Sequence, residues 1–278
     1  MKFDMGQAWS QATGTLAANR DLVTIVAGVF FFLPYLALVL MVPDLSSELP
    51  AQAGGDPEAM FDAMMALYAR IWPYLLIVAI LQGIGSLSLL ALLRDSTRPT
   101  LGEAIKLGLI AFLPYVGAQL MVGAGVGLVA AVLAGGAAAI NAALGALVLL
   151  VVLVAAIYVM VKLSLVMPVV AIERIYNPIA AISRSWRLTK GNSLRLFLFY
   201  FLIMIAGMIV ILVIQMVLGL VFALFGAEGQ AIGNGVVSSL LNAAWATIFL
   251  AVLAATHHQL AGTQSGSNGR ATSLGGEG

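Results

Sequence analysis

The sequence predicts an all-α fold: a polytopic membrane bundle of six transmembrane helices, with amphipathic helices at the cytoplasmic interface. The first supporting observation is composition, since 62% of the residues are hydrophobic and only 9% are charged, unlike a soluble domain. The second is that six apolar stretches each reach the ~20 residues that a bilayer-crossing helix needs. These predicted spans cover residues 22–42, 71–93, 107–134, 144–171, 196–224 and 235–258.

The third observation is the uneven distribution of positive charge between the segments that connect the spans. If the N-terminus is cytoplasmic, eleven Lys and Arg residues fall on the cytoplasmic side and only Arg70 on the other. Lys162 lies within a span and is counted on neither side. Because short cytoplasmic loops carry an excess of Lys and Arg, both termini are predicted to be cytoplasmic. The eleven residues are Lys2, Arg20, Arg94, Arg98, Lys106, Arg174, Arg184, Arg187, Lys190, Arg195 and Arg270.

The spans are predicted to form one membrane domain over residues 1–260, followed by a disordered tail over 261–278. The tail is rich in Gly, Ser and Thr and lacks apolar periodicity, which is typical of disorder. The first span is predicted to be retained, because the first 20 residues lack the apolar core of a signal peptide. The Ala- and Gly-rich composition favours a bacterial protein, so the predicted location is the bacterial inner membrane.

Three hairpins of two spans each are predicted, and a polar or amphipathic segment precedes each hairpin. Asp4 is predicted to cap the first of these segments, and Thr100 with Glu103 forms a capping box at the second. The tetrapeptide Phe-Leu-Pro-Tyr occurs at 32–35 and again at 112–115, which favours parallel repeats. The acidic outer connection is predicted to end in a short interfacial helix over residues 57–70.

The third segment, residues 178–190, is predicted to be an interfacial helix. Asn177 is a suitable N-cap, Pro178 suits the first turn and Gly191 suits the position after the end. On a helix, an apolar face and a basic face are then expected, so that the basic face meets anionic lipid headgroups. The helix is either a topology anchor or a site that docks lipid headgroups or a protein partner. The apolar face comprises Ile179, Ile182 and Trp186, and the basic face comprises Arg184, Arg187 and Lys190.

Lys162 is the main candidate for a functional residue, because ionisable residues within spans are often functional. It either snorkels at the cytoplasmic interface or, if its helix continues to residue 172, lies deeper among other helices. Glu173 would share its helix face, about 16 Å away at 1.5 Å per residue, too far for a direct ion pair. The two roles left open for Lys162 are a structural anchor and a lipid or ligand contact.

Amide side chains and small residues within the spans are predicted to serve helix packing. Buried amides usually hydrogen-bond between helices, and glycines allow close helix approach. A polar pathway lined by the amides and bent helices at Pro34, Pro114 and Pro168 is the alternative. The amides are Gln82, Gln119, Gln215 and Asn242, and the glycines are Gly83, Gly85, Gly123 and Gly127.

Catalytic and metal chemistry are not predicted. The chain has no cysteine, and no HExxH motif or phosphate-binding glycine loop occurs. His257 and His258 are adjacent, so on a helix they point about 100° apart and do not share a metal. No catalytic residue, metal, cofactor or nucleic-acid surface is therefore expected.

A set of residues between 162 and 191 resembles the membrane domain of the glycerophosphoryl diester phosphodiesterase membrane-domain family. It is also similar to related six-span bacterial membrane proteins of unknown function. In these families catalysis belongs to a separate soluble barrel, for which this chain has no room, so the resemblance implies the membrane part alone. The matching residues are Lys162, Pro168, Glu173, Pro178, Ala181, Ser185, Trp186, Leu188, Lys190 and Gly191.

The function predicted from the sequence is that of a non-enzymatic lipid-interacting or scaffolding component of the membrane. Its expected partners are anionic lipid headgroups on the cytoplasmic side and other membrane proteins. The alternative is a small transporter or channel with a polar path near Lys162; an intramembrane enzyme ranks third. The predicted contact residues are Lys162, Glu173, Arg184, Trp186, Arg187 and Lys190.

Overall fold

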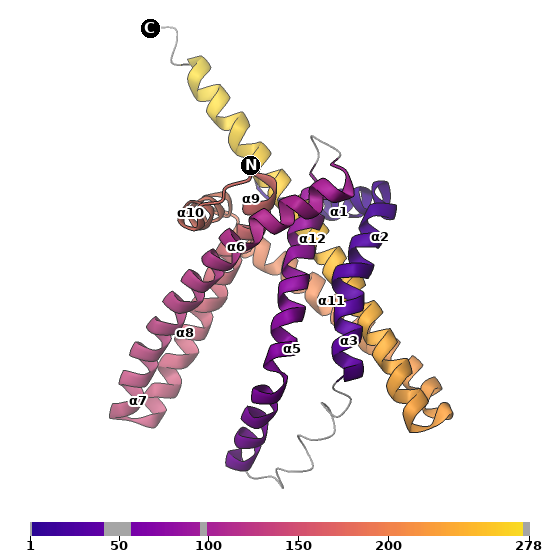
Figure 1. Cartoon of the computed structure of the whole chain (residues 1–278). Helices are drawn as coiled ribbons and strands as arrows, with labels where there is room; N and C mark the ends of the chain where they lie inside the picture. The colour runs from indigo at the N-terminus through magenta and orange to yellow at the C-terminus, as the bar shows by residue number, and fades with distance from the viewer. Residues whose placement is uncertain (1, 42–56, 95–98, 275–278) are drawn as a thin grey trace. The chain divides into compact units, whose positions relative to one another are not determined.

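A computed structural model describes residues 2–41, 57–94 and 99–274, and the regular elements in these ranges are helices (Figure 1). The all-α prediction is confirmed. The elements are α1 (Met5–Ala18), α2 (Arg20–Ala27), the π-helical turn η1 (Gly28–Phe32), α3 (Leu33–Met41), α5 (Pro57–Leu92), α6 (Leu101–Ala130), the π-helical turn η3 (Ala131–Gly135), α7 (Gly136–Ile140), α8 (Ala142–Leu163), α9 (Val166–Ile172), α10 (Pro178–Leu188), α11 (Ser193–Phe222), the 3-10 turn η4 (Ala223–Phe225) and α12 (Gly226–Leu274).

Five helical segments are long and apolar enough to cross a membrane. Many large apolar side chains on them are exposed, including Leu113, Leu153 and Leu220. A soluble monomer rarely exposes so much contiguous apolar surface, whereas a membrane protein presents it to lipid. The five segments are Arg20–Met41, Glu58–Leu92, Leu101–Ile140, Ala142–Ile172 and Ser193–Gly262, and the last contains both α11 and α12.

The chain divides into two compact units, which are described separately. Unit 1 comprises Met1–Asn19, Leu87–Ile203 and Phe249–Gly278. Unit 2 comprises Arg20–Ser86 and Met204–Ile248.

Unit 2 contains α2 to α3, most of α5, and a hairpin in which η4 and Gly226 separate the end of α11 from the start of α12. Gly226 has a φ of 77°, a conformation that glycine adopts without a steric penalty. A small core of Leu38, Leu67 and Ile71 joins α3 to α5. The turn η1 lies just before Pro34, whose missing N–H cannot bond within an α-helix, and there the Leu33 N–H donates to the Gly28 carbonyl instead.

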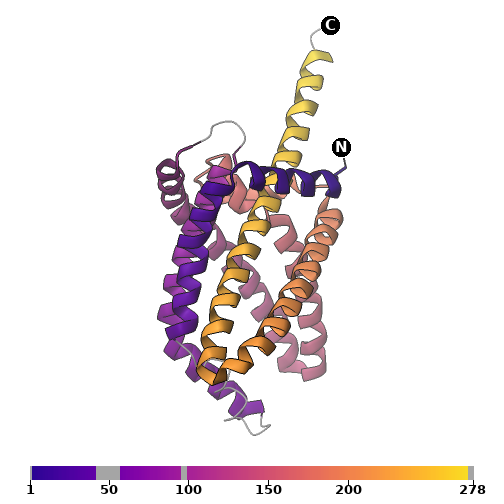
Figure 2. The same cartoon turned by 90° about the vertical axis from the view of Figure 1, so that its right-hand side faces the viewer.

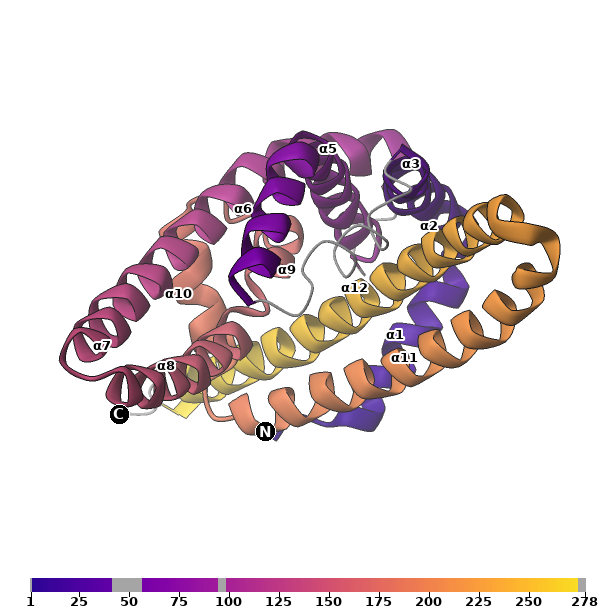
Figure 3. The ribbon, with the colours of Figure 1, turned by 90° about the horizontal axis from the view of Figure 1, so that it is seen from below.

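Unit 1 contains a second hairpin, in which α6 and α7 run beside α8 (Figures 1 and 3). The helix is interrupted between the end of α8 at Leu163 and the start of α9 at Val166. Pro168 lies four residues after Ser164, which is in this interruption. Since Pro168 has no N–H for the Ser164 carbonyl, the α-helical pattern cannot pass through this point unchanged. Pro73 and Pro114, by contrast, lie inside α5 and α6 without ending them.

The N-terminal helix α1 lies across the part of α12 that belongs to unit 1 (Figure 2). Asp4 caps α1 by accepting a hydrogen bond from the Gln7 N–H, as predicted. The Gln259 amide of α12 donates to the Gln7 side chain at 2.8 Å and to the Asp4 carbonyl at 3.3 Å. The capping box of Thr100 and Glu103 at the start of α6 is also confirmed.

Two expectations differ from the structure. Residues 57–70 are not a separate interfacial helix but the first turns of α5, because the helix continues through Pro73. The structure describes α12 as far as Leu274, and the predicted disorder of the tail over 261–278 stays a prediction. Gly123 and Gly127 were predicted to pack closely, but a Cβ added to either would meet nothing within 4 Å.

Gly85 does occupy a close helix contact, as predicted, against Phe30 and Phe31 in unit 2. Two sequence predictions concern residues outside the described ranges. They are the acidic character of the outer connection before residue 57 and the cytoplasmic placement of Arg98.

Candidate functional site

The candidate site of unit 1 is built around the junction of α8, α9 and α10. Asn177 caps α10 by accepting hydrogen bonds from the Ile179 and Ala180 N–H groups, and Pro178 occupies the first turn. After α10, Gly191 has a φ of 82°. The local signals that predicted this helix are therefore confirmed, and they fix where its side chains lie.

Hydroxyl groups of α10 fasten it to the end of α8. The Ser185 hydroxyl donates to the Lys162 carbonyl at 2.9 Å, and the Thr189 hydroxyl donates to the same carbonyl at 3.2 Å. The last carbonyls of a helix lack partners within the helix, so these hydroxyls satisfy a group that the break after α8 leaves open. Both hydroxyl side chains are fully buried.

The Lys162 side chain is held between two aromatic rings. Its Nζ lies 5.6 Å from the ring centre of Tyr158 and 5.4 Å from that of Trp186. The two rings meet edge to face with centres 6.1 Å apart. Lys162 is only 3% exposed, whereas Trp186 is 41% exposed. The ammonium is thus stabilised by cation–π attraction at a place where the surrounding rings reach the surface. We call Lys162, Tyr158 and Trp186 the lysine cage.

Glu173, just beyond α9, forms a cluster with Arg184 and His257 instead of pairing with Lys162. The Arg184 Nε donates to its carboxylate at 2.9 and 3.2 Å, and His257 Nε2 lies 2.8 Å from Oε1. Burial acts to raise the pKa of Glu173, but the hydrogen bonds and positive charges of His257 and Arg184 outweigh it and lower this pKa to about 2. The carboxylate is therefore ionised at neutral pH.

The structure separates the six predicted contact residues into two groups. Lys162 and Trp186 belong to the lysine cage, while Glu173 and Arg184 belong to the ion-pair cluster. Arg187 near the end of α10 and Lys190 just after it are exposed.

The face of α10 that packs within unit 1 is not the predicted apolar face. Ile179 is 64% exposed, and the buried residues of the helix are Ala181, Ser185 and Leu188. Small side chains permit the close approach that the two hydroxyl bonds to the Lys162 carbonyl require, and the interfacial role of the apolar face stays a prediction.

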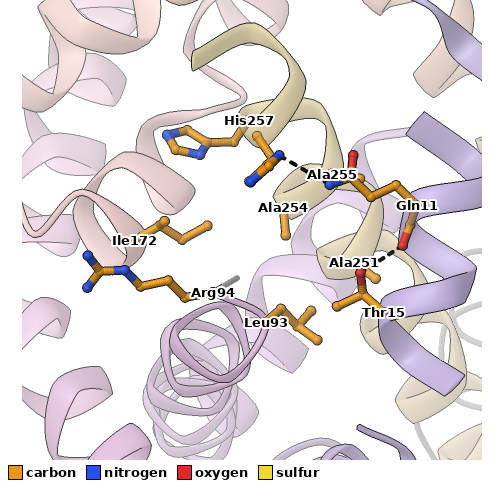
Figure 4. Close-up of a pocket in the computed structure, with 10 residues that line it drawn as sticks. Gln11, Thr15, Leu93, Arg94, Ile172, Ala251, Ala254, Ala255 and His257 are labelled. Carbon is orange, nitrogen blue, oxygen red and sulfur yellow. Dashed lines mark hydrogen bonds between the residues drawn. The ribbon is translucent and has the colours of Figure 1, made fainter. Parts of the chain in front are cut away.

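A pocket lies beside the cluster, between α1, the C-terminal end of α5 and α12 (Figure 4). The Gln11 amide of α1 lies 3.2 Å from His258 Nδ1, and the Thr15 hydroxyl donates to the Gln11 carbonyl at 2.8 Å. The pocket has a volume of about 150 Å³. We call it the α1–α12 pocket, and its lining is Gln11, Thr15, Leu93, Arg94, Ile172, Ala251, Ala254, Ala255, His257 and His258.

Sequence reasoning missed His257, Arg94 and Gln11 as site residues. The sequence pattern tests His257 only as a metal ligand and assigns Arg94 only to the charge bias that sets topology. Both histidines lie at the end of the last predicted span, on the side of the membrane where Glu173 is also predicted to lie. Because an ionised carboxylate there needs a cation, this placement is the sequence signal that could have identified His257. In the described residues, no group of three or more His, Cys, Asp or Glu is placed to hold a metal ion.

These features define an all-helical protein with helices long and apolar enough to cross a membrane and a polar cluster where three of its helices meet. The chain belongs to the DUF7847 family, a domain family of unknown function, whose model matches residues 88–260. That range includes the lysine cage, Glu173, Arg184 and both histidines, but not α1. Comparisons with curated proteins and with solved structures found no match. The resemblance to the glycerophosphoryl diester phosphodiesterase membrane-domain family stays a prediction.

Proposed function

We propose that this chain is a non-enzymatic, six-span protein of the bacterial inner membrane that binds anionic phospholipid headgroups at its cytoplasmic face through the lysine cage. The observation that carries this proposal is a buried cation surrounded by aromatic rings instead of by carboxylates.

Six spans follow from counting α11 and α12 separately within the segment Ser193–Gly262. The glycine turn at Gly226 supports this count, because it separates two helices that are each longer than the ~30 Å hydrocarbon core at 1.5 Å per residue. With six spans, both termini lie on one side, and the positive-inside rule assigns that side to the cytoplasm. Lys162 then lies at the cytoplasmic end of α8.

A lipid phosphate is the counter-charge that best suits Lys162 at this level. Within the described part of the chain Lys162 forms no ion pair, and Glu173 is occupied by Arg184 and His257. A largely buried ammonium is costly without an anion, and two aromatic faces compensate only partly. Trp and Tyr side chains concentrate at the headgroup level of membranes, and Arg187 of α10 and Lys190 just after it add positive charge near Trp186.

Replacing Lys162 with Met is expected to weaken retention of anionic lipid about tenfold. Met keeps an unbranched apolar side chain for packing but removes the charge, and a contact worth about 1.4 kcal/mol corresponds to that factor. Nanodiscs containing equal amounts of phosphatidylglycerol and phosphatidylcholine would be analysed by native mass spectrometry. The measured quantity is the ratio of the two lipids that remain bound.

The matched control is Lys106→Met, which removes an exposed cation from α6 in the same unit. It should change the lipid ratio by less than twofold. An unchanged ratio in Lys162→Met, with an intact thermal transition, would rule out the lysine cage as the lipid site.

A transporter or channel is the second candidate, and a pocket in unit 2 favours it. Gln215 of α11 lines this pocket of about 570 Å³ together with Glu228, Asn234 and Ser238 of α12. Two of the other amides have structural hydrogen bonds, since Gln119 donates to Tyr115 of its own helix and Asn242 donates to the Phe31 carbonyl. A polar path would therefore begin at Gln215, not at Lys162.

Cysteine labelling tests this second candidate without background, because the chain has no cysteine. If the pocket connects to water, Gln215→Cys should react with a membrane-impermeant maleimide added from the outer side. Leu220→Cys, at a highly exposed apolar position of the same helix, should stay unlabelled in lipid. Equal protection of both cysteines would remove the support for a polar path.

A further inference from the structure

We propose that the α1–α12 pocket is a second site, which binds a phosphate group. It is distinct from the lysine cage, and the proposal does not depend on the function proposed above. The recognising groups are the Arg94 guanidinium, the two histidine rings and the Gln11 amide.

The charge of the lining favours an oxyanion. Among the described residues that line the pocket, Arg94 carries the formal charge and none is Asp or Glu. The carboxylate of the neighbouring cluster, Glu173, is already bonded to Arg184 and His257. An arginine fork binds phosphate oxygens through two parallel hydrogen bonds, so Arg94 is the described cation that an anion in this pocket would meet.

His257 adds a second, independent observation. The residue is 3% exposed, its Nε2 faces Glu173, and its Nδ1 is buried without a hydrogen-bond partner in the described structure. A buried polar atom without a partner costs roughly 1–3 kcal/mol, so a ligand that supplies one would be favoured. Because the ionised Glu173 accepts the hydrogen on Nε2, Nδ1 is the ring atom that is left for a ligand.

The contacts that hold the two helices of the pocket together, and the size of the pocket, suit a group as small as phosphate. The Gln11–His258 contact and the bonds from Gln259 to Gln7 and Asp4 hold α1 against α12. A volume of about 150 Å³ accommodates several water molecules, and hence the five heavy atoms of a phosphate. Ala251, Ala254 and Ala255 also line the pocket and are apolar. Selectivity for an anion would therefore come from the polar lining groups.

Calorimetric titration of inorganic phosphate into the full chain in phosphatidylcholine nanodiscs tests the site. Arg94→Gln is expected to weaken phosphate binding at least tenfold, and Arg94→Lys, which keeps the charge but loses the fork, should weaken it less. Lys106→Gln, which removes an exposed cation of α6 outside both proposed sites, should leave the affinity within twofold.

A second experiment distinguishes the two sources of a phosphate group, a free anion and a lipid headgroup. Nanodiscs doped with phosphatidic acid are analysed by native mass spectrometry with the same variants. Phosphate binding that depends on Arg94 identifies a free anion as ligand, and retention of phosphatidic acid that depends on Arg94, without phosphate binding, identifies a lipid headgroup. Either result supports the site, whereas Arg94 variants that fold normally and change neither measurement overturn it.

Discussion

Replacing Glu173 with Gln is expected to lower the free energy of unfolding by about 2–3 kcal/mol. The carboxylate is the shared acceptor of Arg184 and His257, and removing one member of a partly buried charged cluster leaves its partners desolvated without compensation. Gln keeps the shape and one acceptor oxygen, so the loss reports charge rather than packing. For a chain of this length, a fall of about 5–10 °C in the thermal midpoint is expected in detergent.

Asp21→Asn is the matched control for this change. Asp21 pairs with Arg20 at 3.5 Å, but both side chains are almost fully exposed to solvent, where such pairs contribute less than about 1 kcal/mol. A small shift in both variants would contradict the view that Glu173 ties α9, α10 and α12 together.

The same cluster should make the wild-type protein sensitive to acid. The folded pKa of Glu173, about 2, lies below its ordinary value of 4.5, so the unfolded chain binds the proton more readily as the pH falls. The stabilisation is present above about pH 4.5 and is lost as the pH falls toward 2. Glu173→Gln should lack this component, which a comparison of thermal midpoints at pH 7 and pH 3 would measure.

The second large effect is expected from Gly85→Ala in unit 2. A Cβ at this position would overlap the Cβ of Phe30 and lie 2.8 Å from its Cγ and 3.3 Å from Cε1 of the buried Phe31. The Cβ and Cγ of Phe30 are the fixed part of that side chain, so η1 or α5 must move. Overpacking of this kind costs about 1–3 kcal/mol, and we expect a loss of about 2 kcal/mol in thermal or denaturant unfolding.

Gly123→Ala provides the control, since the added Cβ there meets nothing within 4 Å. Alanine is the better helix former, so this variant should be neutral or gain up to about 1 kcal/mol. If both substitutions had the same effect, the contact between Gly85 and η1 would not limit packing in unit 2.

Local sequence signals predicted the helices well because each depends on neighbouring residues. Apolar length predicted the long helices, Asn177 and Pro178 predicted the start of α10, and Thr100 with Glu103 predicted the capping box. These features depend on residues within a turn or two of chain, so distant contacts are not needed to infer them. The same reasoning identified Lys162, Glu173 and Arg184 as candidates from residue type and position alone.

Contacts between distant segments could not be predicted in this way. His257 lies 84 residues after Glu173 along the chain, and no periodicity in the sequence links them. The straight-helix estimate placed Lys162 and Glu173 on one face, but the break before Pro168 sends Lys162 to Trp186 and Glu173 to Arg184. A single local interruption thus redirected both side chains.

The sequence by itself determined the class of this protein, its helices and their caps, because hydrophobic length and backbone hydrogen bonding are local properties. Only the tertiary structure decided which charges meet, which glycines are crowded and which face of α10 is buried. Those outcomes depend on the fit of side chains from separate helices, as in the small residues Ala181 and Ser185, which lie against α8 while Ile179 remains exposed. Packing and desolvation act between helices, and the sequence of one helix does not specify which other helix packs against it.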